Sequence, residues 1–213
     1  MSWSRRGIRC THLHSGGGER GLFTIKLPSE EQISSILDRH SGTPFSYSQV
    51  GRSRHEPLPD GYNVDRNAIQ LGSGESAFVA AKVALRRWEM FDLGWLRVQP
   101  TEEIRQGALV AVVVSHFHFH SVNLSRIVYV EESDDAAPFF RFAYGTTREH
   151  AEMGEERFTI SWNRSNDSVT YEILAFSRPR AALARIGYPL SRGLQKRFAR
   201  ASLAAMARAV SAA

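Results

Sequence analysis

The feature that most constrains the fold is a run of strand-like segments that fills residues 94–177 with no helical segment between them. The segments are rich in β-branched and aromatic residues, and Gly, Asn, Asp or Pro marks the junctions. The expected strands are residues 95–99, 109–119, 124–131, 139–145, 155–162 and 169–176. Successive strands joined by short turns pair antiparallel, so this run predicts a meandering antiparallel sheet.

Helical patterns flank this run. Ser29 and Gln32 form a capping-box pair ahead of a narrow apolar stripe, and residues 72–91 place Phe78, Leu85 and Trp88 on one helical face. Residues 180–210 predict a long carboxy-terminal helix, and short strands at 22–27 and 64–71 precede the two shorter helices. The order predicts an α+β fold in which a curved antiparallel sheet grips a helix and leaves room for a cavity between them.

Length and composition favour a single domain. A chain of 213 residues with 42% hydrophobic residues can bury an ordinary globular core. We expect a flexible basic tail over residues 1–20 and one domain over residues 21–213. The tail contains Arg5, Arg6 and Arg9 with no carboxylate before Glu19, but it lacks the apolar segment of a secretory signal.

The expected compartment is the cytoplasm of the cell. The only cysteine, Cys10, excludes an internal disulfide and any cysteine-based zinc cluster. The longest apolar run, residues 108–114, is too short to cross a bilayer, so we expect a soluble protein without a transmembrane segment. An acid-poor amino terminus also fits an organellar transit peptide if the source is a plant.

Positive charge is concentrated after Glu172, beyond which the chain has no acid and eight lysines and arginines. The functional alternative is a contact with anionic lipid or nucleic acid. The plainer interpretation is a solvated helix face, because cations favour the carboxyl end of a helix. We expect nucleic acid and anionic membranes to be less suitable partners than a small molecule.

The stretch HFHFH places His116, His118 and His120 at alternating positions after an apolar run. On a strand they would share one face, and two neighbours would bind a metal ion only if another strand supplied a third ligand. The alternative without a function, which we favour, is that the strand leaves the core here and the imidazoles lie in solvent. We therefore expect no metal and no cofactor. The stretch GSGESA similarly resembles a dinucleotide-binding turn, but its preceding strand is polar, so we expect only a glycine-permitted helix entry.

Reactive side chains gather near one predicted turn. Glu156 has the same strand parity as Phe158 and Trp162, so it should project toward the core or a cavity. A buried carboxyl requires a partner, and the candidates are Arg178 by parity, His150 and Tyr144. The functional alternatives are an acid/base pair of His150 and Glu156 or an anion-binding group, and the structural alternative is a salt bridge between strands.

Several longer runs resemble one family over nearly the whole chain. They are FAYGTTREH, GEERF, SVTYEILAFSRP and PLSRGLQKRFA, preceded by DGYNVD, LGSGESAF and RRWEMFDLGW. The family occurs in bacteria and plants and is known only as a domain of unknown function. It is grouped with the START-like, birch-pollen-allergen-like helix-grip superfamily, which implies a hydrophobic cavity between the sheet and the terminal helix. The resemblance carries over no substrate, cofactor or catalytic residue.

We therefore expect a protein that binds a small apolar or amphipathic ligand. The expected lining is Trp88, Trp95, Phe142, Tyr144, Phe158 and Trp162, with Glu156 or Arg178 at a polar end. The first alternative is a cyclase-like or hydrolase-like enzyme that uses His150 and Glu156. The second is an anionic-surface binder that uses the arginines after Glu172.

Overall fold

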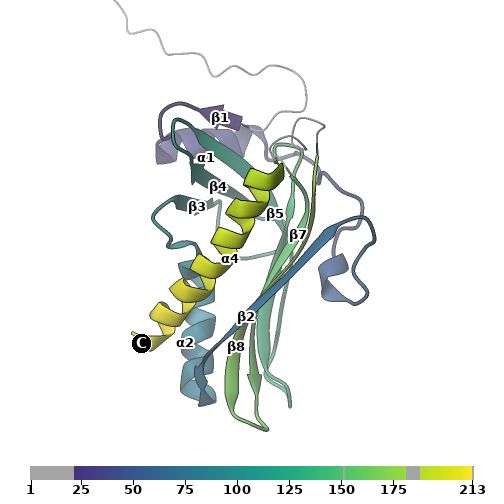
Figure 1. Cartoon of the computed structure of the whole chain (residues 1–213), viewed down its shortest axis with the longest axis vertical. Helices are drawn as coiled ribbons and strands as arrows, with labels where there is room; N and C mark the ends of the chain where they lie inside the picture. The colour runs from purple at the N-terminus through teal and green to yellow at the C-terminus, as the bar shows by residue number, and fades with distance from the viewer. Residues whose placement is uncertain (1–21, 151, 181–187, 213) are drawn as a thin grey trace, which may run out of the picture.

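The computed structural model describes residues 22–150, 152–180 and 188–212, and the predicted basic tail lies outside these ranges. An eight-stranded antiparallel sheet curves along a long carboxy-terminal helix, with two shorter helices beside it (Figure 1). The predicted α+β helix-grip fold is confirmed.

The sheet has the order β2-β8-β7-β6-β5-β4-β3, and β1 pairs with the first part of β5. Its strands are β1 (Leu22–Thr24), β2 (Asn63–Ser73), β3 (Leu96–Pro100), β4 (Leu109–Ser115), β5 (His120–Ser133), β6 (Phe139–Thr146), β7 (Glu152–Asn163) and β8 (Ser168–Pro179). From β3 to β8 each strand pairs with the next, so the run predicted as a meander forms one. β2 lies at one edge, as its polar alternation predicts.

Two helices pack against one side of the sheet, which we call the helix-facing side. They are α2 (Gly74–Arg86) and α4 (Tyr188–Ser211), with the short turn η2 (Glu89–Phe91) between α2 and β3. The largest core cluster lies here and joins Phe78 and Leu85 of α2 to Phe142 and Phe158 of the sheet and to Met206 of α4. Burial of these side chains against one sheet surface is what holds α4 in the curve of the strands.

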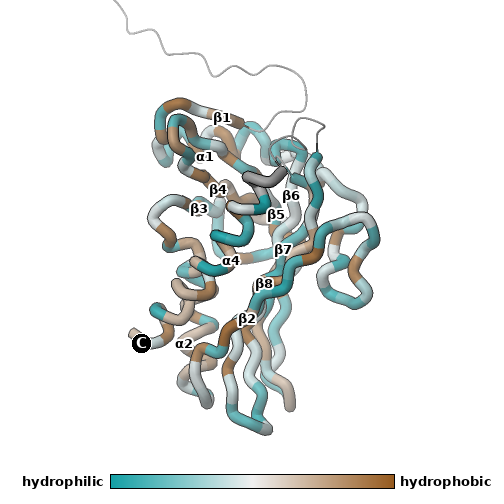
Figure 2. The backbone as a smooth tube through the Cα atoms, in the orientation of Figure 1, coloured by the Kyte–Doolittle hydropathy of each residue, from teal (hydrophilic) through white to brown (hydrophobic). Residues whose placement is uncertain are grey.

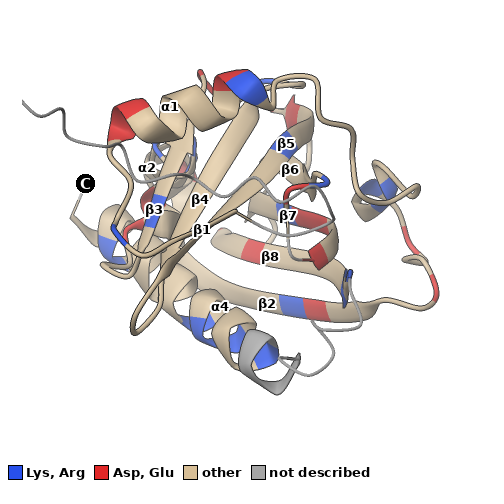
Figure 3. Ribbon diagram, turned by 90° about the horizontal axis from the view of Figure 1, so that it is seen from above, with Lys and Arg blue, Asp and Glu red and all other residues tan. Residues whose placement is uncertain are grey.

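The opposite, outer side of the sheet is also covered. The helix α1 (Glu30–Arg39) begins at the capping box of Ser29 and Gln32 and buries Ile33, Ile36 and Leu37 against β4 and β5. The chain from residue 41 to residue 62, with the single turn η1 (Arg52–Arg54), contacts β7 and β8. Figure 3 shows α1 and α4 on opposite sides of the strands. Both faces of the central strands are therefore buried.

Two local predictions have clear outcomes. Gly74 has φ +81°, and its N–H donates to the Asp167 carbonyl at 2.9 Å, so glycine does permit the entry into α2. The strand predicted over residues 109–119 ends at Ser115, because Ser115 pairs with His120 and the chain reverses between them. The His116 N–H closes that turn on the Phe119 carbonyl at 2.9 Å, so the histidines do not share a strand face.

Candidate functional site

Glu155 and Glu156 are neighbours on β7 that face opposite sides of the sheet. Glu156 pairs across the ladder with Tyr144 of β6 and Ala175 of β8 and points to the helix-facing side. Glu155 pairs with Gly145 and Phe176 and points to the outer side. Strand alternation alone sends the two carboxyl groups into different environments.

The helix-facing carboxyl is held by one hydroxyl. The Tyr144 hydroxyl donates to Oε2 of Glu156 at 2.5 Å. Among the described residues Oε1 of Glu156 has no hydrogen-bond partner, and the side chain is only half-buried. One carboxyl oxygen is thus positioned by the protein while the other can accept or donate a further hydrogen bond.

Aromatic rings surround this pair on the helix-facing side. The Tyr144 ring lies 5.4 Å from that of Phe158 and 6.5 Å from that of Phe91, between ring centroids. Phe91 in turn lies 5.1 Å from Phe198 of α4. The carboxyl group therefore stands at the border of an apolar surface shared by the sheet, η2 and α4.

This environment alters the protonation of both groups. Loss of water contact raises the pKa of Glu156 to about 7, the Tyr144 hydrogen bond lowers it in part, and the nearby carboxylates Glu152 and Asp65 raise it further. Burial and the adjacent Glu156 carboxyl raise the pKa of Tyr144 well above its ordinary value. Near neutral pH the tyrosine remains a hydrogen-bond donor while Glu156 exists in both protonation states.

The first half of α4 is tied to the sheet beside this pair. Asp65 of β2 pairs with Ala175, the residue that also pairs with Glu156, and Arg192 binds Asp65 with Nη2 2.8 Å from Oδ1. Gln195 donates through Nε2 to Glu152 at 2.5 Å and to Ser177 at 3.2 Å. A polar row therefore crosses the sheet from β6 to β2 beneath the start of the helix.

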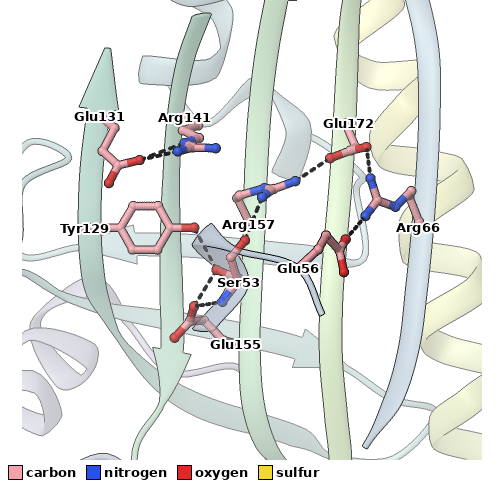
Figure 4. Close-up of polar contacts among 9 residues, drawn as sticks. All are labelled: Ser53, Glu56, Arg66, Tyr129, Glu131, Arg141, Glu155, Arg157 and Glu172. Carbon is pink, nitrogen blue, oxygen red and sulfur yellow. Dashed lines mark hydrogen bonds and ion pairs between the residues drawn. The ribbon is translucent and has the colours of Figure 1, made fainter. Parts of the chain in front are cut away.

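Glu155, on the outer side, has a full set of donors. It is 2% exposed and accepts from the Tyr47 hydroxyl at 2.7 Å, the Gly51 N–H at 2.7 Å, the Ser53 N–H at 3.0 Å and the Ser53 hydroxyl. The Ser53 hydroxyl also contacts the Tyr129 hydroxyl at 2.7 Å (Figure 4). The carboxylate holds η1 and its flanking loop on the sheet, so its role is structural.

Ion pairs extend this network over the outer side. Arg157 donates to the Ser53 carbonyl at 2.6 Å and to Glu172 at 2.7 Å, and Glu172 also pairs with Arg66 at 3.0 Å (Figure 4). Glu131 accepts from both Arg54 and Arg141 at 2.7 Å. Every charged group in these pairs has a protein partner, which leaves this network little capacity for a ligand.

The predicted aromatic lining is brought together only in part. Trp88, Phe142, Phe158 and Tyr144 form a continuous set, with Trp88 and Phe158 each 5.2 Å from Phe142. Trp162 lies six residues beyond Glu156 on β7 and packs on Phe78 of α2 at 5.9 Å. Trp95 lies under the guanidinium of Arg197 at 4.5 Å. Neither of these two tryptophans makes a ring contact with the Tyr144 set.

Arg178 and His150 do not join Glu156. Arg178 pairs with Met153 and stacks on Tyr62 at 4.6 Å on the outer side, so of the three candidate partners of Glu156 it is not the one that the carboxyl binds. The parity argument failed because apolar side chains are buried on both sides of β8: Phe176 packs on Tyr47 and Tyr62 on the outer side, whereas Ile173 belongs to the helix-facing core. The His150 Nδ1 accepts from the Glu152 N–H at 3.0 Å, and burial lowers the pKa of its imidazole to about 4.

The imidazoles of HFHFH have local partners. His116 Nε2 lies 3.0 Å from the Ser121 hydroxyl, and His120 Nδ1 lies 3.1 Å from the Ser115 hydroxyl. In the part of the chain that the structure describes, no group of three His, Cys, Asp or Glu side chains is arranged to hold a metal ion. The three histidines therefore do not converge on one point.

Several residues beside Glu156 were missed from the sequence. Phe91 and Phe198 complete the aromatic surface, and Asp65 and Arg192 anchor α4. The helical pattern over residues 180–210 does not indicate which rings Phe198 contacts. Asp65 lies on an edge strand 91 positions before Glu156 in the numbering, and only the β2-β8-β7 register brings the two together.

The arginines after Glu172 are dispersed. Arg178 stacks on Tyr62, Arg192 binds Asp65 and Arg197 covers Trp95, whereas Arg185 lies outside the described ranges. In Figure 3 the described part of α4 carries basic residues and no acidic ones. Among the described residues, no helix combines the length and apolar character needed to cross a membrane.

Comparison with known proteins places these features in a family. Residues 46–205 match the family described as a domain of unknown function, DUF1990. A UPF0548 protein of Dictyostelium discoideum is 32% identical over 207 residues, covering 89% of this chain and 96% of the relative. UPF0548 proteins of Arabidopsis thaliana and Deinococcus radiodurans are 32% and 30% identical and cover 87% and 84% of this chain, with 96% and 94% of their own lengths.

Solved structures give weaker similarity. An aromatase/cyclase of Streptomyces sp. R1128 superposes with a TM-score of 0.48 and 10% identity over 70% of this chain and 94% of that one. Ara h 8.0201 superposes with a TM-score of 0.45 and 10% identity over 72% of this chain and 100% of that one. The sequence matches, in contrast, cover most of the chain at 30% identity or more, and the chain therefore belongs to the DUF1990 (UPF0548) family of unknown function.

Proposed function

We propose that this protein binds a small amphipathic molecule between the helix-facing side of the sheet and the first half of α4. The polar group of the ligand would bind Glu156 and Tyr144. The apolar part would lie against Phe91, Phe158 and Phe198. One observation carries the proposal: an aromatic surface borders a half-buried carboxyl whose Oε1 has no partner among the described residues.

A bound ligand would offset a free-energy cost that the fold bears at Glu156. A carboxyl group in apolar surroundings destabilises the fold unless it is hydrogen-bonded, and Glu156 receives one donor where Glu155 receives four. A ligand donor at Oε1 would recover part of that cost. Each apolar Å² that the ligand buries would add about 25 cal/mol.

Native mass spectrometry of gently purified protein, followed by solvent extraction, tests the proposal. We expect a reproducible adduct that is lost on denaturation and strongly reduced in Glu156→Gln and Tyr144→Phe. Glu172→Gln, on the outer side, is the matched control and should retain the adduct. Retention in all variants, or a mass without any adduct in the unchanged protein, would contradict binding at this pair.

A second candidate function is acid/base catalysis by Glu156. It is favoured by the pKa of about 7, because a general acid or base works best near the pH at which the enzyme operates. Tyr144 rather than His150 would be its partner, since His150 is bound to the backbone of Glu152. An enzyme releases its product, so an adduct that accumulates in Glu156→Gln but not in the unchanged protein would favour catalysis over carriage.

A further inference from the structure

Large apolar side chains are exposed together at the end of the molecule that carries β1. Figure 1 shows β1 at one end of the long axis, and Figure 2 shows hydrophobic stretches in the chain there. We call the following side chains, given with their exposed fractions, the apolar tip: Phe117 (98%), Ile25 (86%), Phe23 (56%), Leu27 (49%) and Phe119 (40%). Residues 23–27 and the turn that contains Phe117 and Phe119 thus supply five of the large hydrophobic side chains that the structure leaves exposed.

The two segments of the apolar tip are held next to each other. Thr24 of β1 pairs with His120 at the start of β5, and the rings of Phe23 and Phe119 meet edge to face at 5.8 Å. The His116 imidazole stacks on Phe119 at 4.4 Å, between ring centroids. The tip is therefore a defined surface, built on a hairpin end, and not a set of scattered residues.

The two chain segments that form the apolar tip contain no acidic residue. Residues 22–28 and 115–122 contain Lys26 and the three histidines but no Asp or Glu. The next acids along the chain, Glu30 and Glu31, lie in the first turn of α1, where the helix N-terminus favours them. An imidazole has an apolar body and a polar edge, which suits the boundary between lipid chains and headgroups.

We propose that the apolar tip inserts into the surface of a membrane that contains anionic phospholipid. Phe117 lies at a turn and keeps almost its whole surface in water, a cost that insertion among lipid chains would remove. Charge supports this partner. Residues 1–21 lead into β1 and contain four arginines and a single acid, Glu19, and each cation near an anionic surface strengthens binding about fivefold.

The test is co-sedimentation of the full chain with phosphatidylcholine vesicles that contain about 25% phosphatidylserine, compared with pure phosphatidylcholine. We expect binding to the anionic vesicles that falls about tenfold in Phe117→Ser and in Ile25→Ser, since each change removes one large apolar side chain from the contact. Val79→Ser and Val83→Ser, which alter exposed apolar residues of α2, are the matched controls and should bind like the unchanged protein.

Three results would overturn the proposal. The first is a failure of the unchanged protein to sediment with anionic vesicles. The second is that Phe117→Ser binds the vesicles as well as the unchanged protein does. If Arg200→Ser alone lost binding in that case, the contact would lie on α4. The third is a dimer in analytical ultracentrifugation that Phe117→Ser dissociates, because the tip would then bind a second copy. Phe117 is exposed, so its replacement should leave the urea unfolding midpoint unchanged and keep the test interpretable.

Discussion

Glu155 and Glu156 are neighbouring residues of the same type on β7, but the hydrogen bonding and the protonation of their carboxyl groups differ between the two sides of the sheet. The outer side gives Glu155 four donors from residues 47 to 53 and excludes water. The helix-facing side gives Glu156 one donor, and burial raises the pKa of that carboxyl to about 7. The same chemical group is thus a structural anchor on one side and an incompletely hydrogen-bonded carboxyl with a raised pKa on the other.

This difference is the reason why we place the proposed site on the helix-facing side. A carboxylate whose acceptor positions are filled fixes a loop but has little to offer a ligand. A carboxyl with an unsatisfied oxygen beside aromatic rings costs stability, and natural proteins often accept such a cost at functional sites. The outer side therefore maintains the fold, and the helix-facing side carries the proposed chemistry.

The largest expected effect comes from Glu155→Gln. Both carboxylate oxygens of Glu155 accept hydrogen bonds, but an amide has only one oxygen that can accept. The change would therefore leave at least one buried donor of the loop unpaired and would also remove the charge-assisted hydrogen bonds. We expect the free energy of unfolding to fall by about 3–4 kcal/mol in urea denaturation. Glu172→Gln, a partly exposed residue of the same side, is the control and should cost about 1 kcal/mol or less. If Glu155→Gln and Glu172→Gln lowered the free energy of unfolding equally, Glu155 would be no more important to the fold than a partly exposed ion pair.

A smaller and pH-dependent effect is expected for Glu156→Gln. Because the folded pKa of about 7 lies above the ordinary value of 4.5, the folded protein binds this proton more tightly than the unfolded chain. The contribution of this proton to the free energy of unfolding is present in full below about pH 4.5 and is lost as the pH rises to 7. Relative to Glu156→Gln, the unchanged protein should lose about 1–2 kcal/mol between pH 5 and pH 8, after allowance for partial exposure.

Urea unfolding at a series of pH values measures this difference directly. Glu103→Gln, at an exposed position, is the control and should follow the unchanged protein at each pH. Parallel stability curves for Glu156→Gln and the unchanged protein would show that Glu156 titrates near its ordinary pKa. Glu155 and Glu156 would then differ in their hydrogen-bond partners but not in a raised pKa of Glu156.

Local signals in the sequence predicted the fold well. The capping box at Ser29 sets the start of α1 because its hydrogen bonds join residues three positions apart. The alternation and turn residues between residues 94 and 177 are also local signals. They predicted the meander because strands that follow one another in the chain pair with each other. Parity placed Glu156 with Phe158 on the core side, and the structure shows both on the helix-facing side.

The sequence could not show which surfaces meet. The chain from residue 41 to residue 62 has the composition of a surface loop, and nothing local indicates that it covers the outer side and binds Glu155. Under that cover Phe176 is buried on the outer side of β8, so an apolar residue there does not mark the helix-facing side, and parity failed for Arg178. Asp65 and Arg192 meet only through the sheet register and the path of α4. These are tertiary effects that override periodicity.

The smallest effects come from removing one hydroxyl on each side. Tyr47→Phe removes one of four donors to Glu155 and should cost about 1 kcal/mol in the free energy of unfolding without moving the titration of Glu156. Tyr144→Phe removes the single donor to Glu156, whose hydrogen bond lowers that pKa, so the pKa should rise further above 7. Carbon NMR of the Glu156 carboxyl measures it. An unchanged titration would mean that Tyr144 does not position this carboxyl, and the proposed polar end of the ligand site would lose its second member.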